Sequence, residues 1–284
     1  MSIYKISNVL VPVDLSESSL NALDVAVNIA KKHKAALQVL YVDENSLQTI
    51  DDAGTLYFSN MVNVADVINA LVGAIQHAHG IKPVVFMEEG NVAEIIIKTA
   101  FLQHADIIVM GSHGASGYRD GFIGNNTYNV IKHAFCPVLS VPQKRKLNSF
   151  KKILFPIRPV TGALMPYEIV SQFTHPDTVM EVLGINYRMI IETASSILET
   201  IVSEIKDQLK KDGVIAKPLW SEGHSIADEI VNYTNKTNPD LVVVTSVLDV
   251  TSKPRYIGPH AQKIIHCSKA PVLSIKKLSV PSLV

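Results

Sequence analysis

Two stretches of the sequence combine residue types that could hold a phosphate group. The apolar run Val9–Val13 ends in Asp14, and a later apolar run ends in the glycine-rich stretch Gly111–Gly117. Gly124–Thr127 then opens the next amphipathic segment. Glycine lets backbone N–H groups approach an anion without a Cβ in the way. A helix N-terminus adds free amides and a positive dipole end, so the pattern indicates a phosphate cradle.

Alternating apolar runs and amphipathic segments must position these residues. Ser16 can cap a helix whose apolar stripe is Leu20, Leu23, Val27 and Ala30. Further helices are predicted over Val62–His79, Val92–Gln103 and Thr127–His133, between strands at Val9–Val13, Ala36–Val42, Pro83–Met87, Ile107–Met110 and Val138–Val141. This order predicts a doubly wound, parallel α/β sheet. In such a sheet, ligands bind beyond the carboxyl ends of the strands, where both stretches fall.

The chain repeats itself. Asp106–Val141 aligns with Asp240–Ile275 at an offset of 134 without a gap, with ten identities over 36 positions. Asn8–Asp14 matches Lys152–Arg158 at an offset of 144, so the first half holds ten extra residues, expected around residues 44–60. Strands of the second half are predicted at Lys152–Ile157, Val179–Leu183, Ala216–Trp220, Leu241–Thr245 and Val272–Ile275. We therefore expect two tandem five-stranded domains, residues 1–146 and 147–284, joined by a polar linker near residues 143–149.

The composition excludes several classes of protein. The 26 basic residues balance the 26 acidic ones, so the sequence does not favour nucleic acid or an anionic membrane surface as a partner. No apolar run is long enough to cross a membrane, and the first residues do not form a signal peptide. Two cysteines, Cys136 and Cys267, are too few for a disulfide scaffold. The chain is expected to be cytoplasmic, with both thiols reduced.

The glycine spacing also resembles a known motif. Gly111-x-x-Gly114, nine residues and then Gly124 is similar to the nucleotide motif of the ATP-binding universal stress proteins. Asp14 after the first strand and the closing Cys136-Pro-Val-Leu139 agree with that family. The resemblance covers the whole chain as two copies. It implies five-stranded sheets of order 3-2-1-4-5 with helices on both faces, an adenine nucleotide alpha hydrolase-like fold, and ATP between strands one and four.

The resemblance also implies roles for individual residues. Asp14 would accept hydrogen bonds from the ribose or the adenine edge, and Gly111 and Gly114 would pass close to the ribose and phosphates. Residues 124–127 would surround the β- and γ-phosphates. The residues expected at ATP, with or without Mg²⁺, are Pro12, Val13, Asp14, Val42, Met110, Gly111, His113, Gly114, Gly124, Asn125, Asn126 and Thr127. Asn125 stands where the family has Ser or Thr. Asp14 could instead cap the turn after its strand, and His113 could be a surface loop residue.

The second half has lost most of this motif. Asp14 corresponds to Arg158, Gly111 to Thr245 and Gly114 to Leu248. Gly258 remains, but Pro259, which follows it, has no N–H to donate. We expect a structural or regulatory second half without an ATP site.

Three functions are compatible with these features. The leading hypothesis is an ATP-binding stress-response protein that acts as a nucleotide-dependent sensor or regulator, with protein partners that the sequence does not name. The second is an interaction or scaffold protein of the same family that binds no nucleotide. The third is an enzyme, at most a slow ATPase, since no Walker lysine follows the glycine loop.

The final strands also predict how the halves assemble. Pro137–Val141 and Pro271–Ile275 are near-copies that can pair antiparallel about a pseudo-twofold axis. This pairing would make the chain an intramolecular pseudo-dimer, with Leu139 and Leu273 buried between the halves. A homodimer would then have to use another surface.

Overall fold

The computed structural model describes residues 4–44, 61–113, 124–143, 147, 149–157, 166–186, 200, 203–204, 210, 213–222, 225–246 and 257–276. The elements of the first half are β1 (Asn8–Pro12), α1 (Glu17–His33), β2 (Ala36–Asp43), α2 (Met61–His79), β3 (Val84–Glu89), α3 (Val92–Leu102), β4 (Ile107–Gly111), α4 (Asn125–His133) and β5 (Val138–Val141). Those of the second half are β6 (Lys152–Ile157), α5 (Tyr167–Val170), the 3-10 helix η1 (Ser171–Phe173), β7 (Val179–Asn186), β8 (Ile215–Glu222), α7 (Ile226–Thr237), β9 (Leu241–Ser246), α8 (Pro259–Cys267) and β10 (Val272–Lys276).

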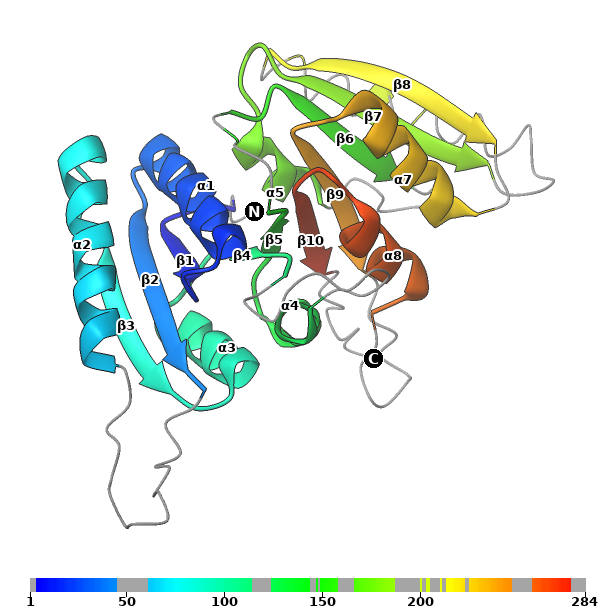
Figure 1. The fold of residues 1–284 in the computed structure, drawn as a ribbon. Helices are drawn as coiled ribbons and strands as arrows, with labels where there is room; N and C mark the ends of the chain where they lie inside the picture. The colour runs from blue at the N-terminus through cyan, green and yellow to red at the C-terminus, as the bar shows by residue number, and fades with distance from the viewer. Residues whose placement is uncertain are drawn as a thin grey trace, which may run out of the picture.

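The strands form one ten-stranded sheet in the order β3-β2-β1-β4-β5-β10-β9-β6-β7-β8. Each half therefore has the predicted order 3-2-1-4-5, with parallel pairing inside the half. Figure 1 shows the two halves meeting at β5 and β10. The α/β fold with parallel, doubly wound strands is confirmed. The two sheets predicted from the repeat are, however, continuous with each other.

The junction between the halves is an antiparallel ladder. Leu139 lies opposite Leu273, flanked by the pairs Ser140–Val272 and Val138–Ser274. Both leucines are fully buried. The antiparallel pairing and the burial of these two side chains were both predicted, and both are confirmed.

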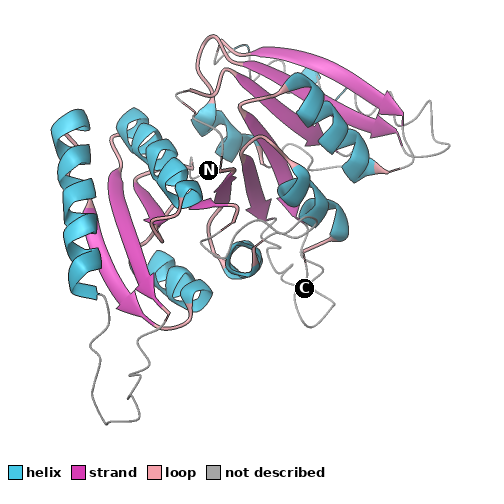
Figure 2. Cartoon of the chain, in the orientation of Figure 1, coloured by secondary structure: helices cyan, strands magenta, loops and turns pink. Residues whose placement is uncertain are grey.

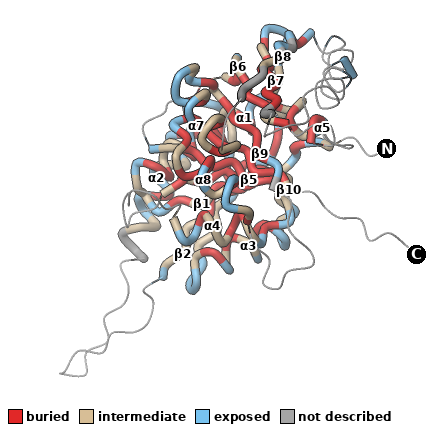
Figure 3. The backbone as a smooth tube through the Cα atoms, turned by 90° about the vertical axis from the view of Figure 1, so that its right-hand side faces the viewer, coloured by how far each residue is buried: buried red, intermediate tan, exposed pale blue. Residues whose placement is uncertain are grey.

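Helices cover both faces of the sheet, as Figure 2 shows. On one face α1, α2 and α5 pack on a buried cluster that includes Val9 and Val11, while α3, α4, α7 and α8 pack on the other face with Leu10. Neighbouring residues of β1 thus enter opposite cores, because successive side chains of a strand point to opposite faces. Figure 3 shows the buried residues concentrated along the central strands.

Helix α1 begins and ends where the sequence indicates. Its N-cap is Ser16, whose side chain accepts a hydrogen bond from the Ser19 backbone N–H, as predicted. At the other end Lys34 adopts a left-handed conformation with φ +53°, which closes the helix. Leu23, Val27 and other residues of the apolar face are buried.

Two expectations concern residues that the structure does not describe. The insertion expected around residues 44–60 lies outside the described residues except for Glu44, and most of the polar linker does too. The boundary between residues 146 and 147 stays a prediction. Among the described residues, no helix combines the length and apolar character that crossing a membrane requires.

Candidate functional site

The sheet topology brings the predicted phosphate-binding segments to one edge. Strand β1 lies between β2 and β4, and all three are parallel. Their carboxyl ends, with the turns after Pro12, Asp43 and Gly111, therefore meet at the switch point where the strand order reverses. Helices α1 and α4 both begin there, so two positive dipole ends point toward the same edge.

The turn after β1 is held by short polar contacts. Asp14 is exposed, and its Oδ1 accepts from the Ser16 backbone N–H at 3.0 Å and from Ser16 Oγ at 2.5 Å. The Asp14 backbone N–H donates to Ser19 Oγ at 3.3 Å. Leu15, which lies between Asp14 and Ser16, has φ +64°, a backbone conformation that costs free energy in residues other than glycine. Strain of this kind is often retained at ligand sites.

Gly111 ends β4 against the first turn of α1. A Cβ placed on Gly111 would overlap Ser18 Oγ and lie 3.0 Å from Ser18 Cβ. Ser18 is itself buried and donates to the Val141 carbonyl at 3.4 Å. The absence of a side chain at Gly111 is therefore required for packing. Ser18 was not among the predicted site residues, although the hydroxyl-rich turn of residues 16–19 carries the signal.

The start of α4 lies next to the end of β4. Gly124 is its N-cap and makes no side-chain capping hydrogen bond. Asn125 and Asn126, in the first turn, are exposed, whereas Thr127 is buried and donates from Oγ1 to the Gly111 carbonyl at 3.0 Å. The first-turn backbone amides thus receive no side-chain cap from Gly124, while the Thr127 hydroxyl ties α4 to β4.

Apolar and acidic groups lie at the ends of β1, β2 and β4. Pro12 and Val42 are half-buried, while Val13 and Met110 are buried. The pKa of the Tyr41 phenol is raised by burial and then by the charges of Asp43 and Asp14. The carboxylates at the ends of β1 and β2 therefore act on one side chain from neighbouring strands.

His113 contacts the second half of the chain. Its Nδ1 lies 2.9 Å from Ser112 Oγ, and its ring lies edge-on to the ring of His266, with the centroids 5.7 Å apart. His266 belongs to α8 and is buried. The end of the Gly111 strand is thus covered in part by the other half, a contact that the sequence did not indicate. Gly114 lies outside the described residues.

The corresponding edge of the second half differs in chemistry. Gly258 is the N-cap of α8, again without a side-chain capping hydrogen bond. Pro259 is the first residue of that helix and removes one backbone donor. Thr245, where the first half has Gly111, is exposed near the end of β9. Arg158 and Leu248 lie outside the described residues.

An adenine nucleotide fits the donor set of the first half. The N-terminus of α4 offers backbone N–H groups to a phosphate, Asp14 offers a carboxylate to hydroxyl or amino donors, and half-buried Pro12 and Val42 offer apolar surface to a base. Among the described residues, no group of three or more His, Cys, Asp or Glu side chains could hold a metal ion.

Comparisons with known proteins agree on one family. Residues 5–142 match the model of the universal stress protein family. Universal stress protein MJ0531 of Methanocaldococcus jannaschii is 32% identical over 148 residues, which are 51% of this chain and 86% of that protein. Universal stress protein YxiE of Bacillus subtilis is 26% identical over 145 residues, which are 48% of this chain and 98% of that protein.

Solved structures resemble the whole chain. A universal stress protein from Archaeoglobus fulgidus has a TM-score of 0.73 at 20% identity, with 95% of this chain and 98% of that one covered. A putative universal stress protein from Pseudomonas aeruginosa has a TM-score of 0.66 at 14% identity, covering 96% and 94%. At these identities, the likeness concerns the fold.

Proposed function

The chain belongs to the universal stress protein family, and we propose that its first half binds one adenine nucleotide, ATP, through which the protein acts as a sensor or regulator in a stress response. The residues proposed at the nucleotide are those named from the sequence, from Pro12 to Thr127. Binding rather than turnover is proposed, because no Walker lysine follows the glycine loop.

The observation that carries this proposal is the start of α4. Its N-cap, Gly124, provides no side-chain capping bond, and the helix begins beside the end of β4 at the switch point of the sheet. A phosphate is the ligand that a helix N-terminus of this kind favours. Asp14 at the end of the neighbouring strand adds an acceptor for the sugar or the base.

Calorimetry on the full chain tests the proposal through its stoichiometry. We expect one ATP per chain, since Pro259 and Thr245 alter the second site. At a hundred times its Kd, ATP should add about 2.7 kcal/mol to the free energy of unfolding. Two equal sites would contradict our interpretation of the second half, and no heat at millimolar ATP would contradict nucleotide binding altogether.

Two neighbouring variants separate the ligand role of Asp14 from its role in the turn. Asp14→Ala removes the carboxylate and therefore both roles, and it should weaken ATP binding by about 1–3 kcal/mol. Ser16→Ala removes the hydroxyl that Asp14 accepts from, but keeps the carboxylate. As it removes the N-cap side chain of α1, it should lower stability by about 1 kcal/mol and leave ATP affinity unchanged. Equal losses of affinity in the two variants would assign Asp14 to the turn alone.

A second candidate is an interaction protein that binds no nucleotide. It is favoured by Asn125, which replaces the hydroxyl residue of the family motif, and by the Thr127 hydroxyl, which donates to Gly111. Mass spectrometry of protein purified without added nucleotide distinguishes the two functions. Bound ATP supports the sensor. Its absence, together with no calorimetric heat, supports the interaction protein.

We also propose a cytoplasmic location. Cys136 and Cys267 are both free thiols, and burial raises the pKa of the Cys136 thiol to about 12, which keeps it protonated and unreactive. Free thiols suit a reducing compartment. Cell fractionation tests this location, and recovery of the protein outside the cytoplasm would overturn it.

A further inference from the structure

A cavity of about 400 Å³ lies between the two halves, away from the ends of β1 and β4. Its lining comes from the second part of α1, from the residues before β6 and from the region of η1. Ligand pockets commonly have 300–1,000 Å³ and often lie at domain interfaces. The cavity has the size and the place of a binding site.

The floor of the cavity is apolar. Ile29 of α1 packs there with Phe150 and Phe173, and all three are buried. The two phenylalanine rings meet edge to face, with centroids 5.2 Å apart and planes at 88°. A floor of this kind favours an aliphatic or aromatic body over a sugar or a free phosphate.

The rim is basic. Lys31, Lys32 and His33 come from the last turn of α1, and His175 comes from the segment after η1. No acidic residue is among the described residues that line the cavity. Two lysines and two histidines thus surround one apolar floor, and the lysine charges attract an anion.

Lys32 is the group best placed to meet that anion. Two of its three N–H groups donate to the carbonyls of Gln172 and Thr174, both at 2.8 Å. His33 Nε2 also lies 2.9 Å from the Gln172 carbonyl oxygen. These bonds fix the ammonium at the cavity wall, and in the described part of the chain the third N–H is left for a ligand.

The pKa values of the basic residues at the rim are lowered. Burial lowers the pKa of Lys32 to about 8. Burial and then the Lys32 charge lower the pKa of both His33 and His175, while Asp177 acts in the opposite sense on His175. Glu168 of α5 accepts a hydrogen bond from the Tyr4 backbone N–H instead. Lys32 is nevertheless exposed, so an anion that enters the cavity can reach its ammonium group.

We propose that this cavity is a second ligand site, which binds a small organic anion with an apolar body, such as an aromatic or branched aliphatic carboxylate or sulfonate. The charged end would lie against Lys32, and the apolar body over Phe150 and Phe173. This site is separate from the nucleotide site and does not depend on it. Because both halves line it, a ligand there would hold them together.

A pair of dyes tests the proposal on the full chain. The probe 8-anilinonaphthalene-1-sulfonate has an apolar body and a charge, whereas N-phenyl-1-naphthylamine has the same body without the sulfonate. Fluorescence titration in saturating ATP should give one sulfonate dye per chain, bound at least tenfold more tightly than the neutral dye. Equal affinities, or displacement of the dye by ATP, would overturn the proposal.

Matched variants locate the site. Lys32→Gln should weaken binding of the sulfonate dye at least tenfold and change the affinity for the neutral dye by less than twofold. Lys236→Gln makes the same change in the last turn of α7, away from the cavity, and should alter neither affinity. Because Lys32 also bonds the end of η1, Ser149→Phe provides a second variant, which fills the cavity without changing charge. Unchanged sulfonate-dye affinity in folded Ser149→Phe protein would overturn the assignment.

The pH dependence provides an independent measure. The fraction of protonated Lys32 rises as the pH falls through about 8, so affinity for the sulfonate dye should rise severalfold between pH 9.5 and pH 7. Lys32→Gln should abolish this rise. A slope that persists in Lys32→Gln protein would show that another group binds the anion.

Discussion

Gly111 has two possible reasons for lacking a side chain. The sequence suggested that glycine there lets backbone amides approach a phosphate. The structure adds that Ser18, at the start of α1, occupies the space of a Cβ. Gly124 differs, because the nearest atom to its Cβ would be the Ser112 carbonyl oxygen at an ordinary 3.4 Å. Of these two glycines, Gly111 is the one that packing alone requires.

Gly111→Ala should therefore destabilise the protein before any ligand is considered. We expect a loss of about 1–3 kcal/mol from overpacking, measured by urea unfolding. Ser18→Ala in the same chain should restore part of that loss, since it removes the overlapping hydroxyl. As a control, Gly73→Ala in α2 has open space around its Cβ and should stabilise the helix by about 0.5–1 kcal/mol. An unchanged stability in Gly111→Ala protein would show that α1 moves aside without cost.

The site residues differ in how far the sequence could reveal them. Asp14 and Gly124 could be proposed from the sequence because strand ends and helix starts carry local signals. The Ser18–Gly111 contact and the edge-on pair of His113 with His266 join residues far apart in the chain. No local pattern specifies such contacts, because they depend on how elements pack.

At the scale of elements, both halves contain the same pair of hydrogen bonds, in which one aspartate accepts from two consecutive backbone N–H groups. We call this contact the polar clasp. The Asp106 side chain accepts from the backbone N–H groups of Ser7 and Asn8 at 2.7 and 2.8 Å. Asp240 does the same for Lys151 and Lys152, at 3.0 and 2.9 Å. The clasp ties the start of the fourth strand of each half to the start of its first. It was not predicted, although Asp106 and Asp240 align in the repeat.

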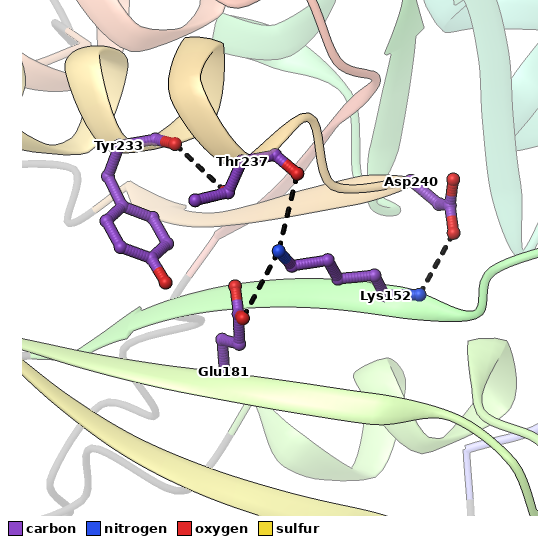
Figure 4. Close-up of polar contacts among 5 residues, drawn as sticks. All are labelled: Lys152, Glu181, Tyr233, Thr237 and Asp240. Atoms are coloured by element: carbon purple, nitrogen blue, oxygen red, sulfur yellow. Dashed lines mark hydrogen bonds and ion pairs between the residues drawn. The ribbon is translucent and has the colours of Figure 1, made fainter.

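Beside this clasp, the two halves use different chemistry. Strand registers place Gln38 and Glu181 at equivalent positions, and likewise Asn8 and Lys152. The first half has two amides there, which donate to carbonyls of residues 103 and 104. In the second half Lys152 Nζ lies 3.2 Å from Glu181 Oε1 and donates to the Thr237 carbonyl at 3.3 Å (Figure 4). A charged pair thus replaces a neutral one in the same place.

Exchanging these residues tests whether the pair acts as a unit. Glu181→Gln or Lys152→Asn alone leaves one charge without its partner at a largely buried position, and should cost about 1–3 kcal/mol. The double variant reproduces the first half and should cost less than the sum, with a coupling of about 0.5–3 kcal/mol. Urea unfolding of all four proteins measures the cycle. Additive costs would mean that the ion pair contributes nothing specific.

The elements themselves were largely predictable. Valine-rich runs such as Val9–Val13 and Leu241–Thr245 marked strands buried on both faces. The observed β1 is shifted by one residue toward the N-terminus, and β9 is longer by one residue at its end. Boundaries shift because a strand ends where its ladder partner ends. For example, β7 extends to Asn186, where it still pairs with β8.

At the scale of the molecule, the two halves join through the β5–β10 strand pair and the hydrogen bonds beside it. Ser140 Oγ donates to the Val272 carbonyl at 3.3 Å, and Lys276 Nζ donates to the Ala134 carbonyl at 2.7 Å. The near-identity of the two final strands allowed the sequence to predict the ladder. It did not predict the cavity on the α1 side of the junction, which depends on where η1 and the described residues before β6 lie.

A fragment of residues 1–146 should replace its missing half with a second copy of itself. Without β10, the apolar strand Val138–Val141 becomes an open edge, and such an edge invites pairing. Since β10 is a near-copy of β5, two fragments can form the same antiparallel ladder with Leu139 opposite Leu139. We expect a homodimer at micromolar concentration by size-exclusion chromatography with light scattering. Leu139→Asp in the fragment should prevent it, because pairing would bury two like charges. A monomeric unsubstituted fragment that keeps its helical circular dichroism would show that the ladder needs the covalent link, and that the two halves are not equivalent partners.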